Sequence, residues 1–181
     1  MGFERTKYKY YNELHRLYRD NVDLLKPCCK INNVLFSHAG VSKDWIDEIN
    51  LKLEQSKSDF RLNWNNIEDY INDEFFKELE SDKALGGLWD SHLDSSIFNI
   101  GAFRGGWDLY GGPFWCDIRE YNDPDNFGIQ IFGHTQLEKT GNFITKGNGT
   151  CLDSRSLFLY DFKSNTFTTP FLNEKEENKN R

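Results

Sequence analysis

The first sustained pattern of apolar and polar positions along the chain has a helical period. From Tyr8 to Leu25, apolar residues recur three or four positions apart. They are Tyr11, Leu14, Leu17, Tyr18, Val22 and Leu25. This spacing predicts an amphipathic helix that ends before Pro27. A chain that opens on a helix, with no strand before it, is an unusual beginning for an α/β domain.

Two more helices are predicted further along. Ser42 is a candidate N-cap, and the apolar residues after it return with a helical spacing. They are Trp45, Ile46, Ile49, Leu51 and Leu53. Either Asn65 or Asn66 could cap a third helix, Ile67 to Leu79, whose apolar residues share one face.

Short apolar runs predict the strands. Val34–Phe36 follows a polar turn at 30–33, and Phe127–Phe132 is a second buried strand. Three consecutive strands are expected after them, joined by turns at 154–155 and 164–165. These are Thr150–Ser154, Leu157–Lys163 and Thr166–Leu172. The sequence therefore predicts a mixed α/β fold, with helices early and antiparallel strands late.

The middle of the chain follows neither period. Residues 86–125 contain three Gly-Gly pairs and three tryptophans, but no sustained helical or strand pattern. Long irregular segments within compact domains are often binding or active-site loops. We expect residues 1–172 to belong to one domain and residues 173–181 to form a disordered tail.

Charge and composition exclude several classes of function for this chain. The 181 residues carry a formal net charge of −7 at pH 7, which argues against a broad nucleic-acid groove or binding to an anionic membrane. No apolar run approaches the roughly 18 residues that a membrane span needs. The four cysteines lack the spacing of a metal site, and free thiols in a reducing compartment fit them best. These features predict a soluble, cytoplasmic protein.

Two histidines occupy matching positions. His38 and His134 each follow a short apolar strand and one further small residue. Open α/β sheets place their ligands at the carboxyl ends of strands, and imidazole is a common ligand of divalent metals. The alternative is a histidine that only hydrogen bonds at a strand end. The pattern leaves both interpretations open.

Acids and arginines that could complete such a site lie nearby in the sequence. Asp117 and Asp153 are the best-placed acids, although Asp153 could also be an ordinary turn residue. Arg104 and Arg119 are beside the glycine- and tryptophan-rich loop, where a guanidinium group could bind phosphate or form a structural ion pair. The glycines do not have the spacing of a nucleotide-binding loop.

Four segments, taken in order, resemble the later motifs of calcineurin-like metallophosphoesterases, of the phosphoprotein-phosphatase and bis-nucleosyl-tetraphosphatase type. Leu35–Val41, which reads LFSHAGV, resembles the family's fourth motif, and Ile131–Thr135, IFGHT, resembles its fifth. Between them, Gly112–Asp117 (GPFWCD) resembles the segment that precedes the fifth motif. Cys151–Ser154 (CLDS) resembles the strand that follows it.

This resemblance implies a metal-dependent phosphatase. It makes His38 and His134 imidazole ligands in a centre of two divalent ions, such as Mn, Fe, Zn or Ni. Arg119, or alternatively Arg104, would bind the phosphate of a phosphorylated protein, nucleotide or small molecule, with Asp117 and Asp153 in support. The reaction implied is an in-line attack on phosphorus by a water that the metals activate. The fold implied is the second half of a helix-covered two-sheet sandwich.

The chain departs from the family because it has neither a G-D pair nor a G-N-H motif. The first three motifs, which supply the remaining ligands and the proton donor, are missing. We therefore expect the carboxyl-terminal part of a truncated domain, with at most a metal half-site, no identified catalytic proton donor, and weak or no activity by itself. The alternatives are a non-catalytic binding module, or an inactive fragment that associates through an exposed sheet edge.

Overall fold

The computed structural model describes residues 10–80 and 95–170. The elements, in chain order, are α1 (Tyr11–Asp20), η2 (Val22–Leu24), β1 (Cys28–Ile31), β2 (Val34–Ser37), α2 (Lys43–Gln55), α3 (Ile67–Glu80), η4 (Ser96–Phe98), η5 (Ala102–Arg104), β3 (Gln130–Phe132), β4 (Ile144–Lys146), β5 (Gly149–Cys151), β6 (Leu159–Asp161) and β7 (Thr166–Thr168). The fold is mixed α/β, as the sequence predicts.

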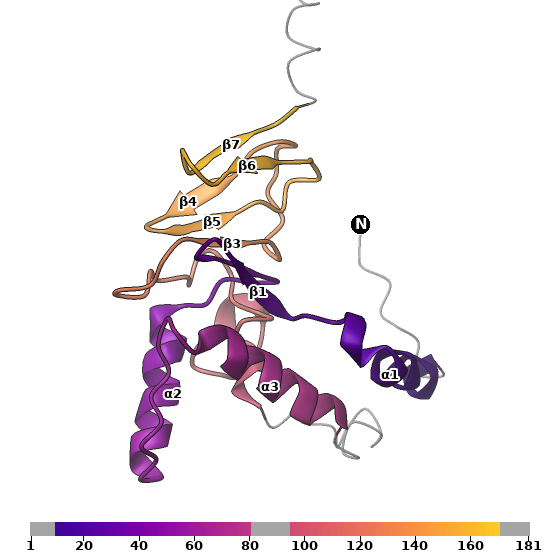
Figure 1. The fold of residues 1–181 in the computed structure, drawn as a ribbon, viewed down its shortest axis with the longest axis vertical. Coiled ribbons are helices and arrows are strands. Elements are labelled where there is room, and N and C mark those ends of the chain that lie inside the picture. Colours follow the sequence, from indigo (N-terminus) through magenta and orange to yellow (C-terminus); the bar gives the residue numbers. More distant parts are fainter. Residues whose placement is uncertain (1–9, 81–94, 171–181) are drawn as a thin grey trace, which may run out of the picture.

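An open five-stranded sheet, with the order β1-β2-β3-β5-β4, forms the centre of the molecule. Its middle strands β2, β3 and β5 are parallel, while β1 and β4 pair antiparallel at the two edges. Helices α2 and α3 lie at the β1 end, and the β6–β7 hairpin, a separate two-stranded sheet, lies at the β4 end (Figure 1). Parallel strands bring their carboxyl ends to one edge of the sheet, so segments distant in sequence meet there.

The expected antiparallel arrangement of the late strands is correct only in part. The β4–β5 and β6–β7 pairs are antiparallel, but β5 also runs parallel to β3. The hydrophobic pattern did not predict β4, a three-residue strand whose side chains are all exposed. Strands β3, β5, β6 and β7 are shorter than expected. Residues 171–172 and the predicted tail 173–181 lie outside the described part of the chain.

Two other expectations are corrected near the start of the chain. The first helix ends at Asp20, well before Pro27, and a short 3-10 turn follows it. The segment expected to be a polar turn begins inside strand β1, which pairs with β2 through a two-residue turn at Asn32 and Asn33. Both asparagines have positive φ, 48° and 62°, as tight hairpin turns require.

The remaining predictions of elements hold. Helix α3 has nearly the expected bounds, and α2 begins just after Ser42, although the Ser42 side chain makes no capping hydrogen bond. Residues 95–125 contain two short 3-10 turns and one isolated bridge between Gly101 and Asp108, so the irregular loop is confirmed over its described part. Within residues 10–80 and 95–170, no helix has both the length and the apolar character needed to cross a bilayer.

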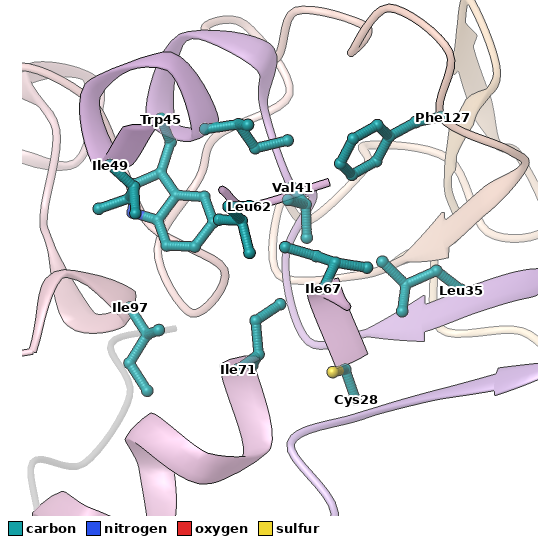
Figure 2. Packing of buried hydrophobic residues seen from close by; sticks show 11 residues of the cluster. Cys28, Leu35, Val41, Trp45, Ile49, Leu62, Ile67, Ile71, Ile97 and Phe127 are labelled. Carbon is teal, nitrogen blue, oxygen red and sulfur yellow. The ribbon is translucent and has the colours of Figure 1, made fainter. Parts of the chain in front are cut away.

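The main hydrophobic core joins the helices to the sheet. Trp45 and Ile49 from α2 face Ile67 and Ile71 from α3, and Leu35 of β2 closes the cluster (Figure 2). Trp45 is fully buried, and its Nε1 donates a hydrogen bond to the Ser96 carbonyl at 2.9 Å. This contact ties the irregular loop to α2. A second cluster, built from Ala39, Cys116, Ile118, Tyr121, Phe132 and Cys151, packs beneath the strand ends where the histidines lie.

Candidate metal and phosphate site

His38 and His134 meet at the carboxyl ends of β2 and β3. The two strands are parallel neighbours, and each histidine follows its strand after at most one residue. His38 Nε2 lies 3.0 Å from His134 Nδ1, and the ring centroids are 4.9 Å apart. The matching positions noticed in the sequence therefore become one pair of imidazoles.

The segments that carry His38 and His134 after β2 and β3 pack closely through their backbones. The Gly133 amide donates to the His38 carbonyl at 3.0 Å. A Cβ on Gly40 would lie 2.6 Å from Tyr121 Cδ2, so only glycine fits there without displacing the ring. The segment after His38 thus depends on a glycine at position 40.

A buried glutamine also fixes this arrangement, and the sequence reasoning missed it. Gln130 of β3 is fully buried, its Oε1 accepts from the Val41 amide at 3.0 Å, and its Nε2 donates to the Val41 carbonyl at 3.1 Å. This pair of bonds anchors the segment after His38 to the strand that leads to His134. The available signal was a single amide side chain inside the apolar run Phe127–Phe132.

Both imidazoles are held in the neutral form. Burial, helped by the positive charge of Arg104 and by the neighbouring His38, lowers the pKa of His134 to about 4. Burial also lowers the pKa of His38, and the Asp153 carboxylate opposes that shift. Neutral imidazoles keep a lone pair available, which metal binding requires.

The described side chains supply only part of the ligands that a bound metal ion needs. Within the two described segments, no group of three or more His, Cys, Asp or Glu side chains is arranged to hold an ion. The two imidazole nitrogens, however, are 3.0 Å apart. Two imidazoles on one tetrahedral zinc would have nitrogens about 3.3 Å apart. To bind one ion, the rings would have to separate slightly, and the ring that donates the hydrogen bond would have to carry its proton on its other nitrogen, with the other ligands coming from elsewhere.

The predicted acids and arginines form a network beside the histidines. Asp117 is only 1% exposed and receives a bidentate contact from Arg119, at 2.8 and 3.0 Å. Arg104 Nε lies 2.9 Å from the same carboxylate. Burial would raise the pKa of Asp117, but the hydrogen bonds from Arg119 and the charge of Arg104 outweigh it and hold the pKa below its ordinary value.

The two arginines differ in exposure and in partners. The Arg119 side chain is 60% exposed and lies over the Phe103 ring at 5.0 Å. The Arg104 side chain is 24% exposed, and its Nη2 donates to the His134 carbonyl and to Thr135 Oγ1, both at 3.0 Å. Thr135, the last residue of the IFGHT segment, is a further site residue to which the sequence assigned no role.

Asp153 follows β5, the next parallel strand, and influences His38 through its charge. Among the described residues its side chain makes no hydrogen bond or ion pair. Its main-chain carbonyl accepts from the Leu137 amide at 2.7 Å. The structure therefore places Asp153 near the pair, while a ligand or support role for it stays a prediction.

A hollow of about 500 Å³ lies away from these residues, between α2 and the loops 61–65 and 124–127. Phe127, in its wall, precedes β3, whereas His134 follows that strand. The hollow thus lies toward the opposite end of β3 from His134, and none of the predicted site residues lines it.

The chain matches no protein-family model, no curated protein and no solved structure with which it was compared.

The lowered histidine pKa values predict how stability depends on pH in the metal-free protein. Between about pH 6.5, the ordinary histidine value, and about pH 4, the unfolded chain binds protons that folded His134 does not. The free energy of unfolding should therefore fall as the pH is lowered through this range. In His134→Asn, which keeps a residue tolerant of positive φ, the fall should be shallower. Urea unfolding at several pH values, with a chelator present, measures how steeply the free energy of unfolding depends on pH in the wild type and in His134→Asn. Equal slopes for the two proteins would refute the lowered pKa of His134.

Proposed function

We propose that the chain carries part of the centre of a metal-dependent phosphoesterase that hydrolyses phosphate esters. The observation that carries this proposal is the pair of neutral imidazoles, with His38 Nε2 and His134 Nδ1 at 3.0 Å on neighbouring parallel strand ends. A buried aspartate that holds two arginines lies beside the pair. These residues agree with the motifs that resemble metallophosphoesterases.

In this proposal each group has a separate task. His38 and His134 would hold a divalent ion, Mn, Fe, Zn or Ni, which supplies activation of water and stabilisation of negative charge on the phosphoryl group. Arg119 is the better phosphate-binding candidate, because its guanidinium group is exposed while Asp117 fixes its orientation. Such a fixed cation can hold phosphoryl oxygens as charge develops on them.

Local charge matters here because the whole chain is acidic. A net charge of −7 repels a phosphorylated substrate, so attraction has to come from the arginines and bound metal. Arg104 and Arg119 provide two positive charges beside the buried Asp117 carboxylate, but the carboxylates of Glu120 and Asp153 also lie close enough to act on Arg119 and His38. The arginines therefore do not by themselves make this region positive, and a bound metal ion would have to supply the remaining attraction for phosphate.

Hydrolysis of para-nitrophenyl phosphate with manganese tests the proposal. We would assay the 181-residue chain and the product of the same reading frame extended upstream of Met1. Because the pair gives too few ligands, we expect weak or no turnover from the chain alone and clear metal-dependent turnover from the extended protein. In the extended protein, Arg119→Met should lower kcat as well as raise KM, because Arg119 is proposed to hold the phosphoryl oxygens as charge develops on them. An extended protein that is inactive with every divalent ion would end the phosphoesterase proposal.

The exposed aromatic loop supports a second candidate, a non-catalytic binding module. Trp107 is fully exposed, and Phe103 and Leu109 are 52% and 72% exposed. Exposed rings of this kind are common in surfaces that recognise partners. Calorimetry with manganese or zinc separates the two candidates, because a binding module does not require metal. Binding that disappears in His38→Ala would favour the phosphoesterase.

A further inference from the structure

We propose that Arg104 is a positioning residue, which holds the backbone of His134 in a left-handed conformation and so brings the two imidazoles together. This inference rests on the phosphoesterase function proposed above, in which those imidazoles hold the metal. It gives Arg104 a task different from direct binding of phosphate.

The backbone at His134 needs an external support. Its φ is +66°, a region that residues other than glycine rarely occupy. Holding such a residue there is energetically costly, and the conformation persists only where the surroundings enforce it. The Arg104 Nη2 group donates directly to the His134 carbonyl at 3.0 Å, at the strained peptide itself.

The same arginine nitrogen also fixes the next residue. It donates to Thr135 Oγ1 at 3.0 Å, and this hydroxyl accepts from the Ile118 amide, also at 3.0 Å. Arg104 Nε meanwhile lies 2.9 Å from Asp117, one residue before Ile118. The turn at 134–135 is therefore held between Arg104 and the segment 117–118.

The His134 ring itself has few other restraints. Among the described residues, its ring packs against His38 and edge-on against Trp115, at 5.3 Å between centroids. Its Nε2 is buried and has no hydrogen-bond partner in the described part of the chain. Since no partner fixes the far side of the ring, the backbone conformation decides where Nδ1 points. A change at Arg104 should therefore displace Nδ1 from His38.

The test compares substitutions of the two arginines that share Asp117. Arg104→Met removes the charge and the donors, and Arg104→Lys keeps the charge but cannot contact Asp117, Thr135 and the His134 carbonyl together. Arg119→Met and Arg119→Lys are the matched controls. NMR of the metal-free protein reports the strong amide-to-α-proton contact typical of positive φ at His134, and the contact between the two rings. Zinc calorimetry then reports the effect on metal affinity.

Both Arg104 variants should lose these two NMR contacts and weaken zinc binding by about 10-fold or more, as removal of groups that orient metal ligands usually does. Both Arg119 variants should keep the contacts. Retention of both contacts in Arg104→Lys would overturn the inference, as would unfolding of both Arg104 variants, because Arg104 would then stabilise the whole fold. If the wild type binds no zinc, the phosphoesterase proposal fails, while the NMR contacts still decide the role of Arg104.

Discussion

Replacing either His38 or His134 by alanine should reduce the affinity for manganese or zinc by more than about 100-fold. Each substitution removes one of two directly bound ligands, and even changes in the groups that only orient a ligand cost about 10- to 100-fold. The two nitrogens are 3.0 Å apart, so both are expected to contact the same ion. Calorimetric titration of the metal-free protein should give a micromolar dissociation constant for the wild type and no measurable heat for either variant.

His15→Ala is the control for this prediction. It removes one of the four histidines, from helix α1 rather than from the strand ends. Its metal affinity should equal that of the wild type. Equal affinity of the wild type and His38→Ala would show that any bound metal sits elsewhere. Loss of binding in all three variants would point to a general effect of removing histidine.

Replacing Trp45 by alanine should lower the free energy of unfolding by about 3–5 kcal/mol, the usual cost of removing a large buried ring. The Trp45 side chain is 0% exposed, packs among residues of α2, α3 and β2, and holds the loop at Ser96 through its Nε1. Trp45→Phe keeps most of the apolar volume but leaves the Ser96 carbonyl without this donor, so its cost should be intermediate. Urea unfolding followed by circular dichroism measures all three proteins.

The matched control is Trp107→Ala, because the Trp107 side chain is fully exposed. The same substitution at the surface should change the free energy of unfolding by no more than about 0.5 kcal/mol. If Trp45→Ala and Trp107→Ala unfold at the same urea concentration, the core described for α2 and α3 is wrong.

The strand ends that carry the histidines could be predicted from sequence because they depend on local pattern. Val34–Phe36 and Phe127–Phe132 are short apolar runs that end in small residues, and such runs are typical of buried parallel strands. In the structure these two strands are parallel neighbours, so their carboxyl ends share an edge of the sheet. The two histidines lie next to each other in the structure, while the metal itself stays a prediction.

The two edge strands of the main sheet could not be predicted from the local sequence. Strand β1 reads CCKI and β4 reads ITK, too short and too mixed to show an alternating pattern. Both are edge strands, fixed by pairing with a neighbour rather than by their own side chains. Their positions follow from tight turns, at 32–33 and 147–148, more than from hydrophobicity.

The details of the site depend on contacts between distant residues. The positive φ of His134 is accompanied by a hydrogen bond from Arg104, 30 positions earlier. Gln130 bonds to Val41, 89 positions away. No local propensity encodes either contact, because each forms only after the sheet and the irregular loop have packed together.

The most direct test of the central claim is the long-range nitrogen–proton NMR spectrum of the imidazoles during titration with zinc, which is diamagnetic. If one ion is shared, the signals of His38 Nε2 and His134 Nδ1 should both shift and should stop changing together at one equivalent. If the two rings are only hydrogen bonded to each other, both signals will stay in place as zinc is added, and that result would contradict the metal site on which the proposed function depends.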